Sequence, residues 1–474
     1  MTNNIHEECG VFGIYSDRTA NVAGTVYLGL YALQHRGQEA CGIAVCDDGV
    51  FSSKKGEGLV SEVFDENTIK SLGEGNIAVG HVRYSTTGGG GLNNIQPLTI
   101  RHIKGNLALA HNGNLVNAEE LRRGFELSGA IFHSTSDTEA IAYEIVSERL
   151  KSSSTEEAVS KIMSKLKGAY SCVLMTATKL IAFRDPNGFR PLVMGKRNDG
   201  AYIIASESAA IKAAGGELVR DIMPGEIAVI DKGGVRSIRT NTCGKGSLCV
   251  FEYIYFARPD SVIDGASVHH ARLRAGQYLA KDSAAAADVV IGVPDSGLDA
   301  AMGYAKESGI PYGIGFVKNK YIGRSFILPE QHSREDAVNI KLSVIKETVN
   351  GKRVVLVDDS IVRGTTCAHI VQLLREAGAK EVHMRVSSPP FRHSCYFGTD
   401  IDSEDDLIAC RYDNTEDIAR VIGADSLAYL SIEATSEIAE DCRLGICNGC
   451  FSGKYPIEIT KAPQKNKFEQ KIHR

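Results

Sequence analysis

The chain has 474 residues, of which 43% are hydrophobic and 23% are charged, and its formal net charge is −5 at pH 7. This composition is typical of a soluble globular protein with about two or three domains. It lacks the basic excess of a nucleic-acid-binding protein, and no stretch of the sequence is apolar enough to span a membrane. The polar, acidic N-terminus does not resemble a secretory signal, so we expect a cytoplasmic protein that binds neither nucleic acid nor membrane.

Two segments with different patterns follow each other along the chain. From residue 9 to about 235, short strands alternate with helices in an α+β pattern, with strands expected at 10–15, 76–83 and 107–111 and helices at 21–34 and 137–150. From about 250 onward, strand–helix alternation predicts an α/β domain with a parallel sheet. Its strands are expected at 288–294, 311–317 and 354–357, with a helix after Gly297.

These patterns predict the boundaries of four segments. Gly233, Gly234 and the polar stretch 240–246 make the expected linker, which divides a domain at 9–240 from a domain at 241–461. Residues 1–8 precede the first strand, and residues 462–474 form a polar, basic tail.

The most informative stretch is VVLVDDSIVRGTT at 354–366. Four aliphatic residues predict a buried parallel strand that ends at Asp358 and Asp359, and a helix is expected to begin just after Thr366. A small-residue loop before a helix offers backbone N–H groups to a phosphate, while two carboxylates suit sugar hydroxyls or a divalent cation. A sugar phosphate bound with Mg²⁺ would meet both demands. The alternative is an ordinary strand–turn–helix with solvated acids.

This stretch resembles the phosphoribosyl pyrophosphate motif of type I phosphoribosyltransferases. The resemblance implies that Asp358 and Asp359 hold the ribose hydroxyls and, with Ser296, a Mg²⁺ ion. It implies a loop that binds the 5-phosphate, formed by Ser360, Arg363, Gly364, Thr365 and Thr366. It also implies a pyrophosphate loop with Asp295 and Ser296, and a flap with the cationic side chains Lys318, Lys320 and Arg324. A solvated basic loop is the alternative for the flap.

Cys9 opens the first strand, where a cysteine is usually structural. Three strings that follow it resemble, in order and spacing, the glutaminase domain of class II glutamine amidotransferases, which are N-terminal nucleophile hydrolases with an αββα sandwich. These strings are QHRGQ at 34–38, GHVRYST at 80–86 and AHNGN at 110–114.

The resemblance implies a role for each matching residue. Cys9 would attack the glutamine amide with its own α-amino group as base, and Asn112 with the N–H of Gly113 would form the oxyanion hole. Arg36, Arg83 and Asp137 would bind glutamine, and the glycine-rich stretch 86–91 would be a lid. Because the α-amine of Cys9 exists only after residues 1–8 are removed, they are expected to be a propeptide.

The order of the two domains, together with the strings at 185–191, 251–261 and 318–326, is similar to the glutamine phosphoribosylpyrophosphate amidotransferase family. Membership implies glutamine-dependent amination of phosphoribosyl pyrophosphate to phosphoribosylamine in the first committed step of purine synthesis. It also implies a homotetramer inhibited by purine nucleotides. Two other readings are a phosphoribosyltransferase-like repressor and a class II amidotransferase with another acceptor. The intact glutaminase strings disfavour the repressor, and the paired acids disfavour the other acceptor.

Twelve cysteines in a cytoplasmic protein favour free thiols, metal ligands or catalysis over disulfides. In the iron–sulfur, propeptide-containing subfamily, four cysteines hold a [4Fe–4S] cluster, and the matching positions here are Cys249, Cys395, Cys447 and Cys450. Zinc and redox roles remain alternatives for the Cys447–Cys450 pair, and Cys442 is a spare thiol nearby. The five cysteines expected in the core are Cys41, Cys46, Cys172, Cys367 and Cys410.

Overall fold

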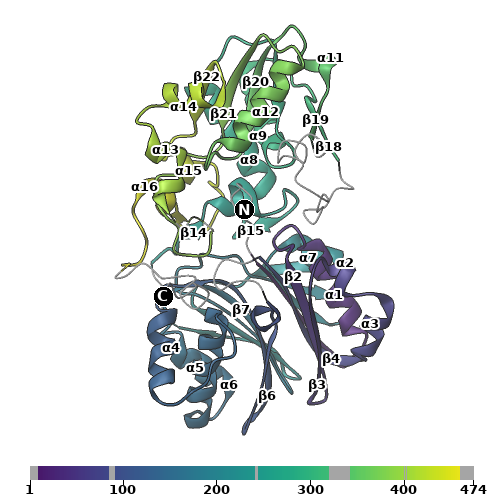
Figure 1. Ribbon diagram of the computed structural model, residues 1–474. Coiled ribbons are helices and arrows are strands. Elements are labelled where there is room, and N and C mark those ends of the chain that lie inside the picture. Colours follow the sequence, from purple (N-terminus) through teal and green to yellow (C-terminus); the bar gives the residue numbers. More distant parts are fainter. Residues whose placement is uncertain are drawn as a thin grey trace, which may run out of the picture.

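The computed structural model describes residues 9–84, 91–240, 244–319, 342–399, 401 and 403–459. Figure 1 shows two lobes, one formed by the first half of the chain, in purple to teal, and the other by the second half, in teal to yellow. None of the helices in these ranges is both long and apolar enough to cross a membrane.

The first lobe contains two antiparallel sheets. One has the order β11-β9-β10-β1-β4-β2-β3 and the other has the order β13-β12-β8-β7-β6-β5. The strands of the first are β1 (Gly10–Ala20), β2 (Ala40–Asp47), β3 (Val50–Glu57), β4 (Gly75–Arg83), β9 (Val193–Arg197), β10 (Tyr202–Ala205) and β11 (Gly216–Asp221). The strands of the second are β5 (Leu98–His102), β6 (Gly105–Leu115), β7 (Gly168–Thr176), β8 (Leu180–Arg184), β12 (Glu226–Asp231) and β13 (Gly234–Arg239).

The two sheets pack face to face, because alternate residues of their strands are apolar and point into a shared core. Val11 and Val79 from one sheet and Ala110 and Val173 from the other are fully buried in it. Helices cover both outer faces (Figure 1). They are α1 (Val22–Ala32), α2 (Val60–Val63), α3 (Glu66–Ser71) and α7 (Ser208–Ala213) on one face, and α4 (Ala118–Leu127), α5 (Asp137–Lys151) and α6 (Thr155–Ile162) on the other. The expected αββα sandwich is confirmed.

The second lobe is built on a parallel sheet of order β17-β20-β21-β22, as the strand–helix pattern predicts. Along β20, Val354 and Leu356 are buried toward one face, and Val355 and Val357 toward the other, so the whole aliphatic run is core. The sheet strands are β17 (Val289–Gly292), β20 (Arg353–Asp358), β21 (Glu381–Val386) and β22 (Ser426–Tyr429). The helices against its faces are α8 (Val268–Asp282) and α9 (Gly297–Ser308) on one side, and α12 (Thr365–Glu376) and α14 (Thr415–Ile422) on the other.

Short elements connect these parts. The strands among them are β14 (Leu248–Cys249), β15 (Val262–Ile263), β16 (Ala266–Ser267), β18 (Phe316–Lys318), β19 (Leu342–Val344) and β23 (Ile446–Cys447). The helical pieces are η1 (Leu92–Asn94), the π-helix η2 (Glu252–Phe256), α11 (Lys346–Val349), η3 (Glu404–Asp406), α13 (Ile408–Arg411), α15 (Ala434–Glu437) and α16 (Gly449–Ser452).

Two sequence predictions are wrong in detail. Residues 311–317 do not form one strand of the parallel sheet: Tyr312 makes a single parallel bridge to Val290, and Phe316 and Val317 belong to β18, which pairs with β19. A β-carbon at Gly315 would lie 2.5 Å from Ile291 Cδ1, so this segment packs closely against β17. Gly233 and Gly234 are not a linker either, because they form the turn of the hairpin between β12 and β13.

Candidate functional site

Cys9 lies at the point where β1 enters the first sheet. Its thiol is buried, and Sγ is 3.4 Å from the carbonyl oxygen of Tyr84, just beyond the end of β4. The pairing of Gly10 with Val82 fixes this placement, since a β-carbon at Gly10 would lie 2.9 Å from Val82 Cγ2. The nucleophile candidate is therefore held at a sheet end, next to Arg83.

Asn112 and Gly113 lie in β6 of the facing sheet. Asn112 is fully buried, and neither its amide oxygen nor its amide nitrogen has a hydrogen-bond partner among the described residues. Gly113 has φ +136, and a β-carbon there would lie 2.2 Å from the carbonyl oxygen of Ala169. Only glycine can hold this backbone, and an unsatisfied buried amide costs free energy unless a ligand pairs with it.

A contact between two histidines connects the sheets. His81 Nε2 lies 3.2 Å from the carbonyl oxygen of His111, and burial together with the charge of Arg83 lowers the pKa of His81 to about 3. His111 Nδ1 lies 3.5 Å from Asp137 Oδ1. A neutral imidazole with such a low pKa is a poor base for a thiol.

Asp137 begins α5, where Ser136 caps the helix. The backbone N–H of Leu115 donates to its Oδ2 at 2.9 Å. Burial alone would raise the pKa of Asp137, but the charge of His111 and the hydrogen bonds lower it overall, so the carboxylate stays ionised. A buried carboxylate at the start of a helix can pair with an ammonium group.

The two arginines predicted to bind glutamine differ in their placement. Arg83 ends β4 and is 4% exposed. Arg36 is fully buried, and its guanidinium donates to the carboxylates of Glu207 and Glu252. Because the chain itself supplies these anionic partners, the expected contact between the Arg36 side chain and glutamine is not supported.

In the second lobe, Asp358 and Asp359 end β20 at the carboxyl edge of the parallel sheet. Ser296, the N-cap of α9, and Ser360 both donate hydroxyl hydrogen bonds to Asp359. Burial raises the pKa of both aspartates, and the neighbouring charge of Asp359 raises that of Asp358 further. Gly297 permits the close approach, since a β-carbon there would lie 2.5 Å from the carbonyl oxygen of Val357.

The loop that follows leads directly into α12, as the sequence predicts. Gly364 is the N-cap, with φ +84, and a β-carbon there would lie 2.5 Å from Ile408 Cδ1. Thr365 and Thr366 are the first two helical residues, so their N–H groups belong to the helix N-terminus. Arg363 donates to Asp406 at 2.7 Å.

The predicted flap begins at the end of β18. Lys318 Nζ lies 2.5 Å from Asp295 Oδ2, which joins the flap base to the pyrophosphate-loop candidate. Lys320 and Arg324 lie outside the described residues, as do residues 86–90 of the predicted lid and the predicted propeptide.

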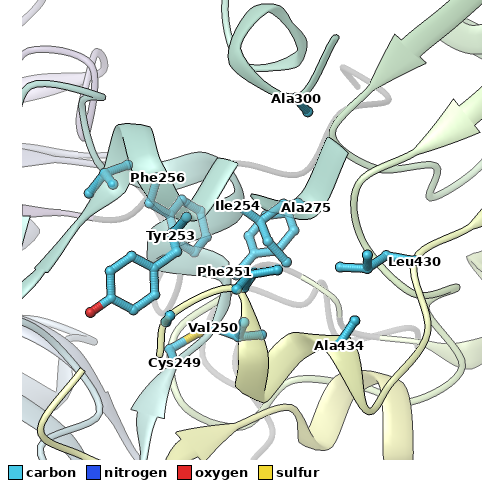
Figure 2. Packing of buried hydrophobic residues seen from close by; sticks show 14 of the residues in the cluster. Cys249, Val250, Phe251, Tyr253, Ile254, Phe256, Ala275, Ala300, Leu430 and Ala434 are labelled. Atoms are coloured by element: carbon cyan, nitrogen blue, oxygen red, sulfur yellow. The ribbon is translucent and has the colours of Figure 1, made fainter. Parts of the chain in front are cut away.

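The four cysteines predicted to bind a cluster come together from three segments. Cys249 and Cys447 are partners in the parallel pair β14–β23, and the carbonyl oxygen of Cys450 accepts hydrogen bonds from the N–H groups of Arg392 and His393. Burial raises the pKa of Cys450, and the nearby Cys395, Cys249 and Cys447 raise it further. Figure 2 shows Cys249 beside Val250 and Phe251 at the edge of an apolar cluster.

The other cysteines differ from expectation at one position. Cys41, Cys46, Cys172 and Cys367 are buried as predicted, whereas Cys410 is exposed at the end of the short α13. A four-residue helix over the surface does not bury its last turn, which explains the error. Within the described ranges, no group of three or more His, Cys, Asp or Glu side chains is placed to hold a single metal ion.

Comparison with known proteins identifies both lobes. A family model described as a glutamine amidotransferase domain matches residues 82–213, and one described as a phosphoribosyl transferase domain matches residues 267–397. The amidophosphoribosyltransferase of Bacillus subtilis is 48% identical over 96% of this chain and 95% of its own length. That of Archaeoglobus fulgidus is 47% identical over 95% of this chain and 98% of its own length.

Solved structures agree with these matches. The Bacillus subtilis glutamine phosphoribosylpyrophosphate amidotransferase, in complex with ADP and GMP, has a TM-score of 0.87 at 47% identity and covers 95% of this chain and 98% of its own. A structure described as the allosteric regulatory enzyme of purine biosynthesis has a TM-score of 0.88 at 48% identity, covering 95% of this chain and 97% of its own.

The fold and the two sites therefore define a glutamine amidotransferase joined to a phosphoribosyltransferase. The chain belongs to the amidophosphoribosyltransferase family. Its activity is the glutamine-dependent amination of phosphoribosyl pyrophosphate in purine biosynthesis.

Proposed function

We propose that Cys9 is the nucleophile that releases ammonia from glutamine, with Asn112 and the N–H of Gly113 as the oxyanion hole. The observation that carries this proposal is the buried amide of Asn112, whose two polar atoms lack partners among the described residues. A tetrahedral oxyanion would supply the missing acceptor for Nδ2. Arg83 pairs with the α-carboxylate of glutamine and Asp137 with its ammonium group.

Replacing Asn112 with alanine should lower kcat for glutamine hydrolysis by about 100- to 1,000-fold, because one oxyanion donor is lost. Synthesis from added ammonium should be unchanged, since the second site does not need this donor. Asn106→Ala, on the same strand and outside the site, is the matched control. Wild-type glutamine turnover in Asn112→Ala would contradict the proposed role of Asn112 in the oxyanion hole.

The α-amino group of Cys9 serves as the base in this proposal. The low pKa of His81 supports it, because that imidazole cannot take the thiol proton efficiently at neutral pH. An α-amine with a pKa of about 8 suits the task. Residues 1–8 would then be a propeptide that must be removed.

Intact-mass analysis of active enzyme should therefore give a chain that begins at Cys9. A variant with Cys9 kept but with processing blocked should hydrolyse no glutamine and still use ammonium. Fully active enzyme that retains Met1 or Thr2 would contradict the α-amine mechanism.

In the second lobe, Asp358 and Asp359 bind the ribose hydroxyls, and the loop from Ser360 to Thr366 binds the 5-phosphate through N–H groups and hydroxyls. Asp295 and Ser296 face the pyrophosphate, with Lys318 and Arg324 as cations of the flap. The carboxylate and hydroxyl oxygens of Asp358, Asp359 and Ser296 are donors that Mg²⁺ prefers. A bound Mg²⁺ would neutralise the departing pyrophosphate.

The donor chemistry of Cys249, Cys395, Cys447 and Cys450 fits a [4Fe–4S] cluster, because the four thiols are near one another and largely shielded from water. Among the described residues, Cys442 is the one further cysteine of the C-terminal segment, and it is a single thiol rather than a group. The cluster would link the C-terminal segment, through Cys447 and Cys450, to β14, through Cys249.

The purified enzyme should be brown and contain about four iron and four sulfide per chain. Replacing Cys447 with serine should remove the iron and lower the free energy of unfolding, because the ligands come from distant segments. Cys442→Ser is the control and should keep its full iron content. A colourless protein with one zinc per chain would contradict this assignment.

Ammonia passes between the sites without entering bulk water, where it would be protonated at neutral pH and lost as a nucleophile. Binding of purine nucleotides, assembly as a homotetramer and a cytoplasmic location are proposed from the family. The Bacillus subtilis structure with ADP and GMP supports nucleotide binding.

A further inference from the structure

The side chain of Asn114 joins the strand of the proposed oxyanion hole to the second lobe. Asn114 follows Gly113 in β6 and is 1% exposed, and its Nδ2 donates to the carbonyl oxygen of Tyr396 at 2.9 Å. The two bonded residues are 282 positions apart in the chain. The lobes are therefore hydrogen-bonded to each other one residue away from the proposed N–H donor of Gly113.

The backbone of β6 departs from regular strand geometry at this point. Gly113 has φ +136, whereas an antiparallel strand residue has φ of about −140°. In the neighbouring strand β7, Gly168 has φ +125, and a β-carbon there would lie 2.4 Å from the carbonyl oxygen of Asn114. Because both strands are irregular here, side-chain contacts outside the strand ladder help to orient the peptide group of Gly113.

A second link reaches the same part of the second lobe from β7. Ser171 lies opposite Asn112 in the β6–β7 pair, and its hydroxyl donates to the carbonyl oxygen of Arg190 at 2.9 Å. The Arg190 guanidinium donates in turn to the carbonyl oxygen of Phe397 at 3.0 Å. The strand pair that carries Asn112 is thus connected to two consecutive peptide groups of the second lobe.

The loop that accepts these hydrogen bonds is itself held on both sides. Tyr455 donates its hydroxyl to the carbonyl oxygen of Ser394 at 2.6 Å, and the centroid of its ring lies 5.0 Å from that of Tyr396. The ring of Phe397 stacks on that of Phe189 in the first lobe, with centroids 4.2 Å apart. A loop fixed by packing on both sides is a rigid support for a catalytic strand.

We infer that Asn114 is a positioning residue for the oxyanion hole, with Ser171 as its counterpart on β7. The inference rests on the roles proposed above for Asn112 and Gly113. Asn114 acts through the backbone, because its bond to Tyr396 holds β6 so that the N–H of Gly113 points to the place where the oxyanion develops. A donor that is present but misplaced stabilises the transition state less well.

Asn114→Ala tests this inference, since it removes the donor to Tyr396 and keeps every residue proposed to touch glutamine. The kcat for glutamine hydrolysis should fall by about 10-fold, because the Gly113 donor is misplaced rather than lost. The KM for glutamine should change by less than about two-fold, since Arg83 and Asp137 still bind the amino acid end. Ammonium-dependent synthesis should stay near the wild-type rate.

A second measurement separates positioning from a general loss of folded enzyme. The aldehyde analogue of glutamine, glutamate γ-semialdehyde, can take up the Cys9 thiol by addition of S–H across its C=O bond, which gives a tetrahedral hemithioacetal. The oxygen of this adduct would lie in the oxyanion hole. In Asn114→Ala, the inhibition constant of the aldehyde should rise by about 10-fold, in step with the fall in kcat. A smaller fraction of folded enzyme would leave this constant unchanged.

Ser171→Ala is the second variant, in case Asn114→Ala folds poorly, because it removes a single hydroxyl from the other link. The same two changes are expected, with smaller factors, since this link runs through Arg190. Asn117→Ala is the matched control, because Asn117 Nδ2 also donates to a backbone carbonyl oxygen, that of Lys165 at 3.0 Å, but within the first lobe. It should lower stability and leave kcat and the inhibition constant at their wild-type values.

Wild-type kcat and a wild-type inhibition constant in both Asn114→Ala and Ser171→Ala would overturn the inference. A fall in kcat without a rise in the inhibition constant, or an equal effect in Asn117→Ala, would overturn it as well. The proposed function fails in a different way, namely if Asn112→Ala keeps wild-type glutamine turnover. The two failures are therefore distinguishable in one set of assays.

Discussion

Replacing Cys9 with alanine should abolish glutamine-dependent synthesis, lowering its rate by more than about 1,000-fold, and should leave ammonium-dependent synthesis at raised pH. The thiol is the only nucleophile in this account that attacks the glutamine amide, and it lies in the first lobe beside Tyr84. The paired acids of the second lobe stay intact. Pyrophosphate release, measured with each nitrogen source in turn, separates the two reactions.

Cys41→Ala is the matched control for this result. Cys41 is buried in β2 of the same sheet, and burial raises the pKa of its thiol to about 12, so it is not a nucleophile at neutral pH. This variant should retain glutamine-dependent synthesis. If Cys9→Ala still used glutamine, the division of the chemistry between the lobes would be wrong.

Replacing Asp359 with asparagine should lower both glutamine-dependent and ammonium-dependent synthesis by about 100-fold or more, because charge-assisted contacts to the substrate are lost. The carboxylate is held by the hydroxyls of Ser296 and Ser360 at the end of β20. An asparagine there is neutral, so it would attract a cation less strongly, and it would accept fewer hydrogen bonds. Steady-state rates at saturating ammonium report the effect directly.

Asp288→Asn is the control for this variant. Asp288 precedes β17 at the opposite edge of the same sheet, where it pairs with Arg353 at 2.8 Å. The same chemical change at this edge should leave both reactions nearly unchanged. An ammonium-dependent rate that survived the loss of Asp359 would show that the acids do not hold the sugar.

The parts of the fold that the sequence predicts well are those with strong local patterns. The aliphatic run before Asp358 became the core strand β20, and the helix after Thr366 became α12, because burial on both faces and a glycine N-cap leave local signals. In the first lobe, the strings at 34–38, 80–86 and 110–114 likewise predict a glutaminase site that includes Cys9, Asn112 and Asp137. Strand pairing within each sheet and the packing of one sheet on the other then set the relative positions of these residues.

The partners of Arg36 could not be predicted in this way. The motif around it suggests a ligand contact, but Glu207 and Glu252 lie 171 and 216 positions away and have no distinctive local pattern. The fold of the first lobe brings Glu207 to Arg36, and the packing of the second lobe on the first brings Glu252. Arg272 of α8 is similar, since it donates to the backbone carbonyl oxygens of Tyr253 and Tyr255, which have no sequence signature.

We propose that one chain releases ammonia at Cys9 and uses it at the site of Asp359 without losing it to water. The most direct test supplies glutamine with an isotope-labelled amide nitrogen together with an excess of unlabelled ammonium at neutral pH. The amine formed should carry the label, and glutamate and pyrophosphate should be produced in equal amounts. Label diluted to the proportion of the bulk ammonium would contradict it.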